Sequence, residues 1–487
     1  MKGSLIPATL VTLLGLGGLV PGCGSKSGGS RKDGSAGATA DVASAGGSAG
    51  GVAGADARGT GGTAGASDAP GSGGVAGSID ARGTTETLGT GGSMRSDAGL
   101  APDSVVAPPA SDAQPDQSIG VDTRDASGTG EAGTVARVKS IVGSLPHTCV
   151  LFDDGTVKCC GYPQFVGTRS VGLATSAPPA LVPGITTAVA IAAGRDYTCV
   201  VLSSGIVQCW GQNTGPEYCS YMCSDVPVTI TGMTDAVGVA YSSTSTSYYN
   251  VCTVQTGGAV QCLGSGTQGQ LGNGTTTASS GPVAVSDITT ATAVASSYNH
   301  NCALLRGGGV RCWGVNTNGQ LGDGTTTNSS LPVAVAGIST AVAIAAGGAT
   351  CALLENGTVK CWGGNSYGQL GDGTTTSSPV PITVPGLEQA IAVSASETHT
   401  CALLKSGTIR CWGANREGQL GNGTTIDSAV PVTVSGIADA VSIAAIGYHS
   451  CAVLSDGKVK CWGNNLFGQL ADGTTTNSSV PVSANWF

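Results

Sequence analysis

Pairs of cysteines spaced ten residues apart recur seven times in the second part of this 487-residue chain. The first cysteines of successive pairs follow one another by 50, 53, 50, 49, 50 and 50 residues. A fixed period of this length indicates a repeat architecture, in which each unit buries its faces against its neighbours. The pairs are Cys149/Cys159, Cys199/Cys209, Cys252/Cys262, Cys302/Cys312, Cys351/Cys361, Cys401/Cys411 and Cys451/Cys461.

Each repeat also contains short apolar runs. They are four to seven residues long, rich in Val and Ile, and bounded by Gly, Pro, Asn or Ser, as at residues 332–335 and 341–346. This pattern is typical of β-strands, and no segment keeps a helical period. Four short strands in each of seven repeats predict an all-β fold for residues 135–487, a seven-bladed β-propeller of about 50-residue repeats.

The ten-residue spacing has a simple explanation in a β-hairpin. If Cys401 lies opposite Cys411, then Leu403 faces Ile409, and the loop places Gly407 where a positive φ is needed. Cysteines directly opposite each other on antiparallel strands have Cβ atoms close enough for a disulfide. Metal binding by thiols would need tighter clusters, such as two cysteines separated by two residues, which the chain lacks. We therefore expect seven cross-strand disulfides, an oxidising compartment and no metal site.

Four cysteines lie outside the seven pairs. Cys219 and Cys223 stand in the second repeat, where residues 217–224 replace the Gly-Gln-Leu-Gly loop of later repeats, and we expect them to pair with each other. Cys160 occupies the position that Trp holds in five other repeats. It is either a free thiol or a competitor of Cys159 for the same partner.

The start of the chain is typical of an export signal. Lys2 precedes an apolar run from Leu5 to Val20, which is shorter than the roughly 20 residues of a membrane-spanning helix. The run ends in Val-Pro-Gly-Cys, closed by Cys23, which resembles a bacterial lipoprotein signal whose cysteine is lipidated. We therefore expect residues 1–22 to be removed, and Cys23 to anchor the chain at a bacterial outer membrane or cell surface. Ordinary secretion with Cys23 as a stray thiol is the alternative.

The segment that follows has a different composition. Residues 24–134 contain 27 glycines, many Ala, Ser and Asp, and almost no large apolar side chains. Such a segment cannot bury enough surface to offset its conformational entropy. We expect residues 23–134 to form a disordered Gly/Ala/Ser-rich tether that holds the propeller away from a membrane. A tract that merely tolerates expansion is the alternative.

Recurring motifs surround each cysteine pair. They are His-Thr-Cys-Ala-Leu-Leu at residues 399–404, Cys-Trp-Gly-x-Asn from residue 411, and Gly-Gln-Leu-Gly with Asn/Asp-Gly-Thr-Thr, as at residues 319–326. The combination resembles the regulator of chromosome condensation repeat family. The resemblance covers residues 135–487, is strong in repeats three to seven and weakens in the first two.

The resemblance implies a seven-bladed propeller. The first repeat departs from the family pattern because it lacks the Gly-Gln-Leu-Gly loop, and the third has Leu263 where Trp is expected. Family members act as guanine nucleotide exchange factors, chromatin binders and, in bacteria, a secreted β-lactamase inhibitor, so the fold carries over better than any activity. The export signal disfavours nucleotide exchange for this chain.

All four histidines of the chain occupy one repeat position, two residues before the first cysteine. Equivalent positions on separate blades are too far apart to share one metal ion. We expect each histidine to make a hydrogen bond at the start of a strand instead. The residues are His147, His300, His399 and His449.

Two further repeat positions carry charge. The residue before the second cysteine is basic in five repeats, which indicates either a ring for an anionic ligand or, as we interpret it, a solvated strand position that discourages edge pairing. The Asp-Gly-Thr-Thr loops offer one carboxylate each, too few for calcium, and we expect them to be turns. The basic residues are Lys158, Arg311, Lys360, Arg410 and Lys460, and the loop acids are Asp323, Asp372 and Asp472.

The loops before the first cysteines vary most between repeats. They hold five of the ten tyrosines, together with Arg195 and Glu397. Tyrosine is favoured at interfaces because it offers a large contact area with a polar tip. Because these loops share one face of the disc, the tyrosines form a candidate binding face; packing between blades is the alternative. They are Tyr197, Tyr248, Tyr249, Tyr298 and Tyr448.

The function classes that remain are few. A net charge of −9 argues against nucleic-acid binding. No Gly-x-Ser-x-Gly elbow, phosphate-binding loop or zinc-protease motif occurs, so we predict no catalytic residue and no cofactor. We expect a monomer that contacts the membrane through its lipid anchor only and that binds a protein or a glycan. An extracytoplasmic hydrolase or lyase is the alternative, and a purely structural role in the envelope is a third hypothesis.

Overall fold

The computed structural model describes residues 136–168, 175–195, 197–211, 224–245, 248–297 and 299–487. The predicted export signal, the tether, Cys23 and the Cys219/Cys223 pair lie outside the described residues. Tyr298 and the side chain of Tyr248 lie outside them as well.

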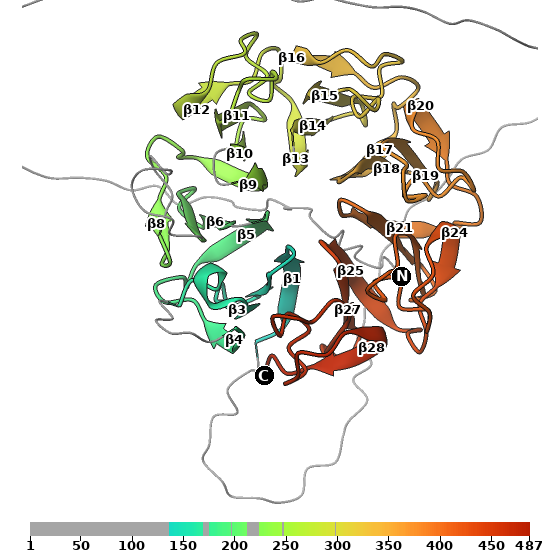
Figure 1. The fold of residues 1–487 in the computed structure, drawn as a ribbon. Coiled ribbons are helices and arrows are strands. Elements are labelled where there is room, and N and C mark those ends of the chain that lie inside the picture. Colours follow the sequence, from blue (N-terminus) through green and yellow to red (C-terminus); the bar gives the residue numbers. More distant parts are fainter. Residues whose placement is uncertain (1–135, 169–174, 196, 212–223, 246–247, 298) are drawn as a thin grey trace, which may run out of the picture. The chain divides into compact units, whose positions relative to one another are not determined.

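Seven four-stranded antiparallel sheets surround a central axis (Figure 1). Each sheet consists of four strands that are consecutive in sequence and run in order from the axis to the rim, so each blade is one repeat. We number the blades 1 to 7 in chain order. The all-β, seven-bladed propeller predicted from the cysteine period is confirmed.

The innermost strands are β1 (Val138–Gly143), β5 (Ala188–Ala193), β9 (Ala236–Ser245), β13 (Ala291–Ser297), β17 (Ala341–Ala346), β21 (Ala390–Ala395) and β25 (Ala440–Ile446). The second strands are β2 (His147–Phe152), β6 (Tyr197–Leu202), β10 (Tyr248–Gln255), β14 (His300–Leu305), β18 (Ala349–Leu354), β22 (His399–Leu404) and β26 (His449–Leu454). The third strands are β3 (Val157–Gly161), β7 (Val207–Gly211), β11 (Val260–Gly264), β15 (Val310–Gly314), β19 (Val359–Gly363), β23 (Ile409–Gly413) and β27 (Val459–Gly463). The rim strands are β4 (Ala177–Leu181), β8 (Val228–Thr229), β12 (Ser279–Ala284), β16 (Ser329–Ala334), β20 (Ser378–Thr383), β24 (Ser428–Thr433) and β28 (Ser478–Ala484).

The hydrophobic core lies between the blades. One cluster joins Cys411 and Leu420 of blade 6 to Ala452 and Trp462 of blade 7, and all four side chains are fully buried. Because a neighbouring blade covers each face, the second strands are buried along almost their whole length and do not alternate apolar with polar residues. A single repeat therefore has no core of its own.

The seven predicted cysteine pairs are disulfides. In blade 6, Cys401 pairs with Cys411 and Leu403 lies opposite Ile409, as the hairpin register requires. Gly407 has a φ of 81°, the left-handed conformation that glycine adopts without strain. The other six bonds are Cys149–Cys159, Cys199–Cys209, Cys252–Cys262, Cys302–Cys312, Cys351–Cys361 and Cys451–Cys461.

Positions that recur in the repeats bind blades 4 to 7 each to the blade before it. The indole Nε1 of Trp412 in blade 6 donates to the carbonyl of Gln369 in the Gly-Gln-Leu-Gly loop of blade 5, at 2.9 Å. Thr400 Oγ1 donates to the same carbonyl at 3.1 Å. The equivalent indole bonds are Trp313 to Gln270, Trp362 to Gln320 and Trp462 to Gln419.

Each of the four histidines bonds the blade that follows its own. His399 Nε2 lies 2.8 Å from Ser450 Oγ of blade 7, and Ser450 Oγ donates to the carbonyl of Gln419 at 2.9 Å. The serine hydrogen is therefore in use, so the Nε2–H of His399 is the donor of the first bond. The expected hydrogen bond at the strand start is confirmed. The other three pairs are His147 with Thr198, His300 with Thr350 and His449 with Thr148.

The ring closes without exchange of a strand between the ends of the chain. Among the described residues, blade 1 consists of β1–β4 and blade 7 of β25–β28, and the hydrogen bonds between them run from side chains to backbone carbonyls, as from Thr148 Oγ1 to Gln469. Cys160 occupies the tryptophan position of blade 1, and its Sγ lies 3.7 Å from the carbonyl of Gln469. Trp486 packs in the same cluster as Cys160, and Lys158 Nζ donates to the carbonyl of Trp486 at 2.7 Å.

Cys160 is a buried free thiol, and Cys159 is paired with Cys149. Burial raises the pKa of the Cys160 thiol, which keeps it protonated and unreactive. The question left open by the sequence, whether Cys160 competes with Cys159, is therefore answered.

The two faces of the disc differ in their loops. The upper face carries the loops from the first to the second strand and from the third to the fourth; the lower face carries short hairpins and the links between blades.

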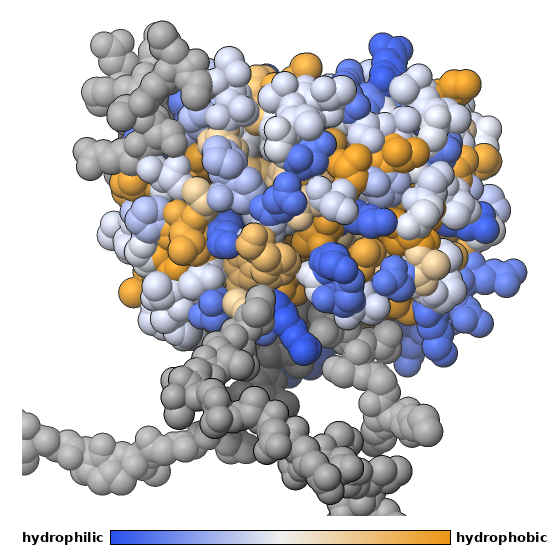
Figure 2. Space-filling model, turned by 90° about the horizontal axis from the view of Figure 1, so that it is seen from below, coloured by the Kyte–Doolittle hydropathy of each residue, from blue (hydrophilic) through white to orange (hydrophobic). Residues whose placement is uncertain are grey.

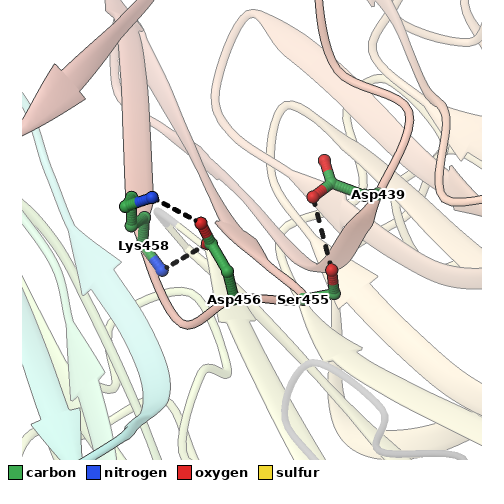
Figure 3. Close-up of polar contacts among 4 residues, drawn as sticks. All are labelled: Asp439, Ser455, Asp456 and Lys458. Carbon is green, nitrogen blue, oxygen red and sulfur yellow. Dashed lines mark hydrogen bonds and ion pairs between the residues drawn. The ribbon is translucent and has the colours of Figure 1, made fainter.

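On the lower face of blade 7, Asp456 forms an exposed ion pair with Lys458 at 2.7 Å and accepts from its amide (Figure 3). Beside it, Ser455 Oγ donates to Asp439 at 3.3 Å. An exposed pair two residues apart shapes the turn and contributes little stability.

The rim is a mixed surface. Seen edge-on, it shows several separate apolar patches among polar side chains (Figure 2). Four rim-strand residues at one repeat position are 42–48% exposed and lie where a side chain at the loop glycine of the preceding blade would contact them. They are Leu331, Val380, Val430 and Val480.

Candidate functional site

The upper face is built on the loops between third and fourth strands. In blade 5, the buried Asn365 accepts from the Leu370 amide at 2.9 Å through Oδ1 and donates to the carbonyls of Thr374 and Thr376 at 3.1 and 3.0 Å. One buried side chain therefore joins the two arms of the loop. Gly373 N donates to the carbonyl of Ala429 on the next blade at 2.9 Å. Asn316, Asn415 and Asn465 make the corresponding contacts in blades 4, 6 and 7.

Two residues in each of these loops change from blade to blade. They follow the asparagine and precede Gly-Gln-Leu, and the glutamine holds their backbone: Gln369 Oε1 accepts from the Tyr367 amide, and Gln469 Oε1 from the Phe467 amide, both at 2.9 Å. The asparagine and glutamine bonds therefore form a constant loop frame, and the side chains at the two positions within it differ from blade to blade. We call these positions the variable pairs: Thr317/Asn318, Ser366/Tyr367, Arg416/Glu417 and Leu466/Phe467.

Blades 5–7 carry large exposed side chains at these loops. Tyr367 is 38% exposed and Leu466 is 59% exposed. Ile426, which stands where other loops have Thr, is 74% exposed. Asn464 of blade 7 donates to Glu417 of blade 6 at 3.1 Å, so neighbouring loops contact each other.

An aromatic row continues this surface onto blade 1. The rings of Phe467 and Tyr162 meet edge-on with centroids 5.3 Å apart. Tyr162 lies against Phe165, with centroids 5.5 Å apart, in the short 3-10 helix η1 (Pro163–Phe165). Aromatic side chains and Arg are enriched at protein interfaces, and this row adds to the apolar side chains of blades 5–7.

The mouth of the central channel also opens on the upper face. Arg195 follows β5 and Glu397 follows β21, and both residues line the channel cavity. Burial raises the pKa of Glu397 to about 7, and the positive charge of Arg195 opposes this. Burial and the neighbouring Glu397 raise the pKa of Tyr448, which lies half-buried beside them. The mouth therefore combines a basic and an acidic group in a partly desolvated setting.

Two family profiles match the repeat region. The RCC1-like domain matches residues 224–486, more than half of the chain, and the regulator of chromosome condensation (RCC1) repeat matches residues 188–214. The chain belongs to the RCC1-like domain family. No curated protein sequence matches this RCC1-like chain.

Solved structures share the RCC1-like fold. Human WBSCR16 is 21% identical with a TM-score of 0.58, over 67% of this chain and 91% of that one. Prp20p from Saccharomyces cerevisiae, whose structure was described with its binding properties to Gsp1p and histones, is 20% identical with a TM-score of 0.56, over 72% of this chain and 87% of that one. At these identities the likeness concerns the fold alone.

The tyrosine face predicted for this RCC1-like propeller needs correction. Tyr197 is 1% exposed and packs against Tyr241, with ring centroids 5.7 Å apart, because β6 is covered by the neighbouring blade. Tyr249 is half-buried against the same cluster. Tyr448 alone among the described tyrosines of that set lies at the channel mouth, and Tyr248 and Tyr298 have no described side chains.

The charged repeat positions have structural roles. Each basic residue lies half-buried on the third strand of its own blade, as Lys158 does on β3, so the structure does not gather them around the axis. Asp372 accepts from the amide and the hydroxyl of Thr374 at 3.0 Å, which is the turn expected of these loops. In the described ranges, no group of three or more His, Cys, Asp or Glu residues is placed to hold a metal.

The variable pairs were missed from sequence. Tyr367, Leu466 and Phe467 stand just before Gly-Gln-Leu, where the motifs predict no binding residue, and Tyr162 lies in the first repeat, which lacks that motif. The available signal was the contrast within the chain itself, since Asn and Gly-Gln-Leu recur around residues that do not. Positions that vary inside a constant frame are free of packing constraints and available for recognition.

Proposed function

We propose that this chain is an extracytoplasmic RCC1-like protein-binding module that recognises its partner through the upper face of blades 5–7. The observation that carries the proposal is the set of variable pairs, in which apolar and charged side chains project from a rigid, constant loop frame. A preorganised loop loses little conformational entropy on binding, which favours affinity.

The composition of this surface supports a protein partner. Tyr367, Leu466 and Ile426 offer exposed apolar area, and Arg416 and Glu417 stand beside them. Apolar anchors surrounded by polar groups are the usual anatomy of a protein interface. A glycan ligand, the other candidate from the sequence, would use the same aromatic rings as stacking platforms.

The cellular location is part of the proposal. Seven disulfides favour an oxidising compartment outside the cytoplasm. The apolar N-terminal run and Cys23 support export and lipid anchoring, with residues 23–134 as the tether. No helix in the described ranges is long and apolar enough to cross a membrane.

Site-specific photo-crosslinking tests this function. A photoreactive residue is placed at Leu466 on the upper face or at Val380 on the rim, 59% and 42% exposed, in the full-length chain expressed in its envelope. We expect a discrete protein adduct at residue 466 that weakens at least about tenfold when Tyr367 is changed to Ala, as for an interface hot spot. Equal adducts at 466 and 380, or none at 466, contradict the proposal. Selective binding to a glycan array that depends on Tyr367 would reassign the ligand class.

A further inference from the structure

Two tyrosines and two glutamates lie close together on the upper face of blades 5–7, which are neighbours in the ring (Figure 1). Tyr367 and Glu417 belong to the variable pairs of blades 5 and 6. Glu397 and Tyr448 stand in the loops between the first and second strands of blades 6 and 7. Tyr367 is 38% exposed, and the other three are half-buried. We call these four residues the tyrosine–glutamate cluster.

Gln369 of the constant loop frame joins Tyr367 to Glu397. Gln369 Oε1 accepts from the Tyr367 amide at 2.9 Å, and Gln369 Nε2 donates to the Glu397 carbonyl at 3.4 Å. The two residues are therefore held at fixed positions relative to each other. Within the described ranges, the Glu397 carboxylate has no hydrogen bond or ion pair and is not sealed from solvent. It is available to a ligand.

Asn464 joins Glu417 to Tyr448 in a similar way. Asn464 Nδ2 donates to Glu417 Oε2 at 3.1 Å, and the Asn464 amide donates to the Tyr448 carbonyl at 2.9 Å. Asn477 donates to the same carboxylate oxygen. Both side-chain donors are neutral amides, so they leave the negative charge of Glu417 without a bonded cation in the described part of the chain.

The surroundings of the cluster are negatively charged. Burial raises the pKa of Tyr448, and the other three residues of the cluster raise it further, whereas Arg195 lowers it. The four groups therefore share one local field. The upper-face loops of blades 5–7 contain five acidic residues and one basic residue. They are Asp372, Glu397, Glu417, Asp427 and Asp472, against Arg416.

We propose that the tyrosine–glutamate cluster receives a Lys or Arg side chain of the protein partner. This inference rests on the proposed function and deepens it, because it names the chemical group that the partner presents. Partly desolvated carboxylates attract a cation more strongly than carboxylates in water do, and tyrosine rings attract cations over their faces. The apolar side chain of Leu466, on the next loop, supplies the contact area beside this charged centre.

A titration with a small cationic probe tests the cluster without the partner. N-acetyl-L-arginine amide is the probe, and N-acetyl-L-citrulline amide is its neutral analogue of nearly the same shape. Ligand-observed NMR on the full-length chain should give a Kd of about 10 mM or tighter for the arginine probe and at least about fivefold weaker binding of the citrulline analogue. Equal binding of the two, or no binding of the arginine probe up to about 50 mM, overturns the proposal.

Variants locate the cation site. Glu397→Gln and Glu417→Gln remove a charge and keep the side-chain volume, and each should weaken binding of the arginine probe about threefold or more. The double variant should lose about tenfold or more, with the melting temperature as the check on folding. Glu355→Gln, at an exposed glutamate on the lower face, is the matched control and should bind the probe as the parent does. Unchanged affinity in the double variant overturns the assignment.

The photo-adduct at residue 466 separates this inference from the proposed function. In the double variant Glu397→Gln/Glu417→Gln, we expect the adduct to weaken at least about fivefold, because the basic group of the partner loses both carboxylates. An adduct of full strength in the double variant keeps the protein-binding function and overturns the basic contact. Absence of any adduct in the parent chain contradicts the proposed function itself, and with it the partner group named for the cluster.

Discussion

At the position two residues before each first cysteine, the chain uses His in four blades and Tyr, Asn or Ala in the other three. The histidines are fully buried, and burial lowers the pKa of His147 and His300 to about 4 and of His399 and His449 to about 3. All four are therefore neutral at pH 7, which suits a ring that bonds the next blade through Nε2–H.

The four buried histidines make the unfolding free energy fall as the pH is lowered. The pKa of each folded-state histidine lies below the unfolded value of about 6.5, so the unfolded chain takes up protons first as the pH drops. The contribution of the buried histidines to the unfolding free energy is fully present above about pH 6.5 and is lost as the pH falls toward 4. His300→Asn, which copies Asn250 of blade 3, should reduce the loss of unfolding free energy between pH 6.5 and 4.5 by about 2–3 kcal/mol. Urea denaturation at a series of pH values measures this.

One group works against this trend. The raised pKa of Glu397 makes the folded state take up a proton as the pH falls below about 7, so Glu397→Gln should steepen the acid loss. If the parent and His300→Asn lose stability with the same pH dependence, the buried neutral histidine is not the cause.

At the scale of the element, the third strand and the Gly-Gln-Leu-Gly loop form one joint between blades. The indole of Trp412 donates to a loop carbonyl, whereas the buried Nε1 of Trp210 has no hydrogen-bond partner in the described residues. Trp412→Phe removes a bond and Trp210→Phe does not, with the same change of volume. We expect Trp412→Phe to lower the unfolding free energy by about 1–3 kcal/mol more than Trp210→Phe. Guanidinium denaturation of the two variants gives the comparison, and equal losses would show that packing alone stabilises the joint.

The hairpins were predictable and the joints between blades were not. Ten residues between Cys401 and Cys411 leave one antiparallel register with a three-residue loop, so local geometry determines the disulfide. The acceptor of Trp412 is a backbone carbonyl about forty residues away, and a carbonyl has no signature in sequence. The burial of Tyr197 was not predictable for a related reason. A residue next to a loop is buried or exposed according to the neighbouring blade that packs on it.

At the scale of the whole molecule, the contact between blades 7 and 1 closes the ring without a shared strand. Trp486 is 1% exposed and packs with Cys160 and Val150, whereas the neighbouring Phe487 is 62% exposed. We expect Trp486→Ala to cost about 3–5 kcal/mol and Phe487→Ala much less. In Trp486→Ala, amide hydrogen exchange should accelerate first in β1 and β25, the innermost strands of the two blades that close the ring. Uniform acceleration in all seven blades would instead indicate that the ring opens as one cooperative unit.

By itself, the sequence determined the period, the strand count per repeat, the hairpin register and the seven disulfides, because these depend on residues close together in the chain. The tertiary structure decided which positions are available for binding. Glu397 and Arg195 line one channel cavity only because seven inner strands converge on one axis, and Phe467 meets Tyr162 only because the last blade packs on the first. Contacts between distant repeats follow from ring closure, and a local sequence pattern cannot predict them because it depends only on residues close together in the chain.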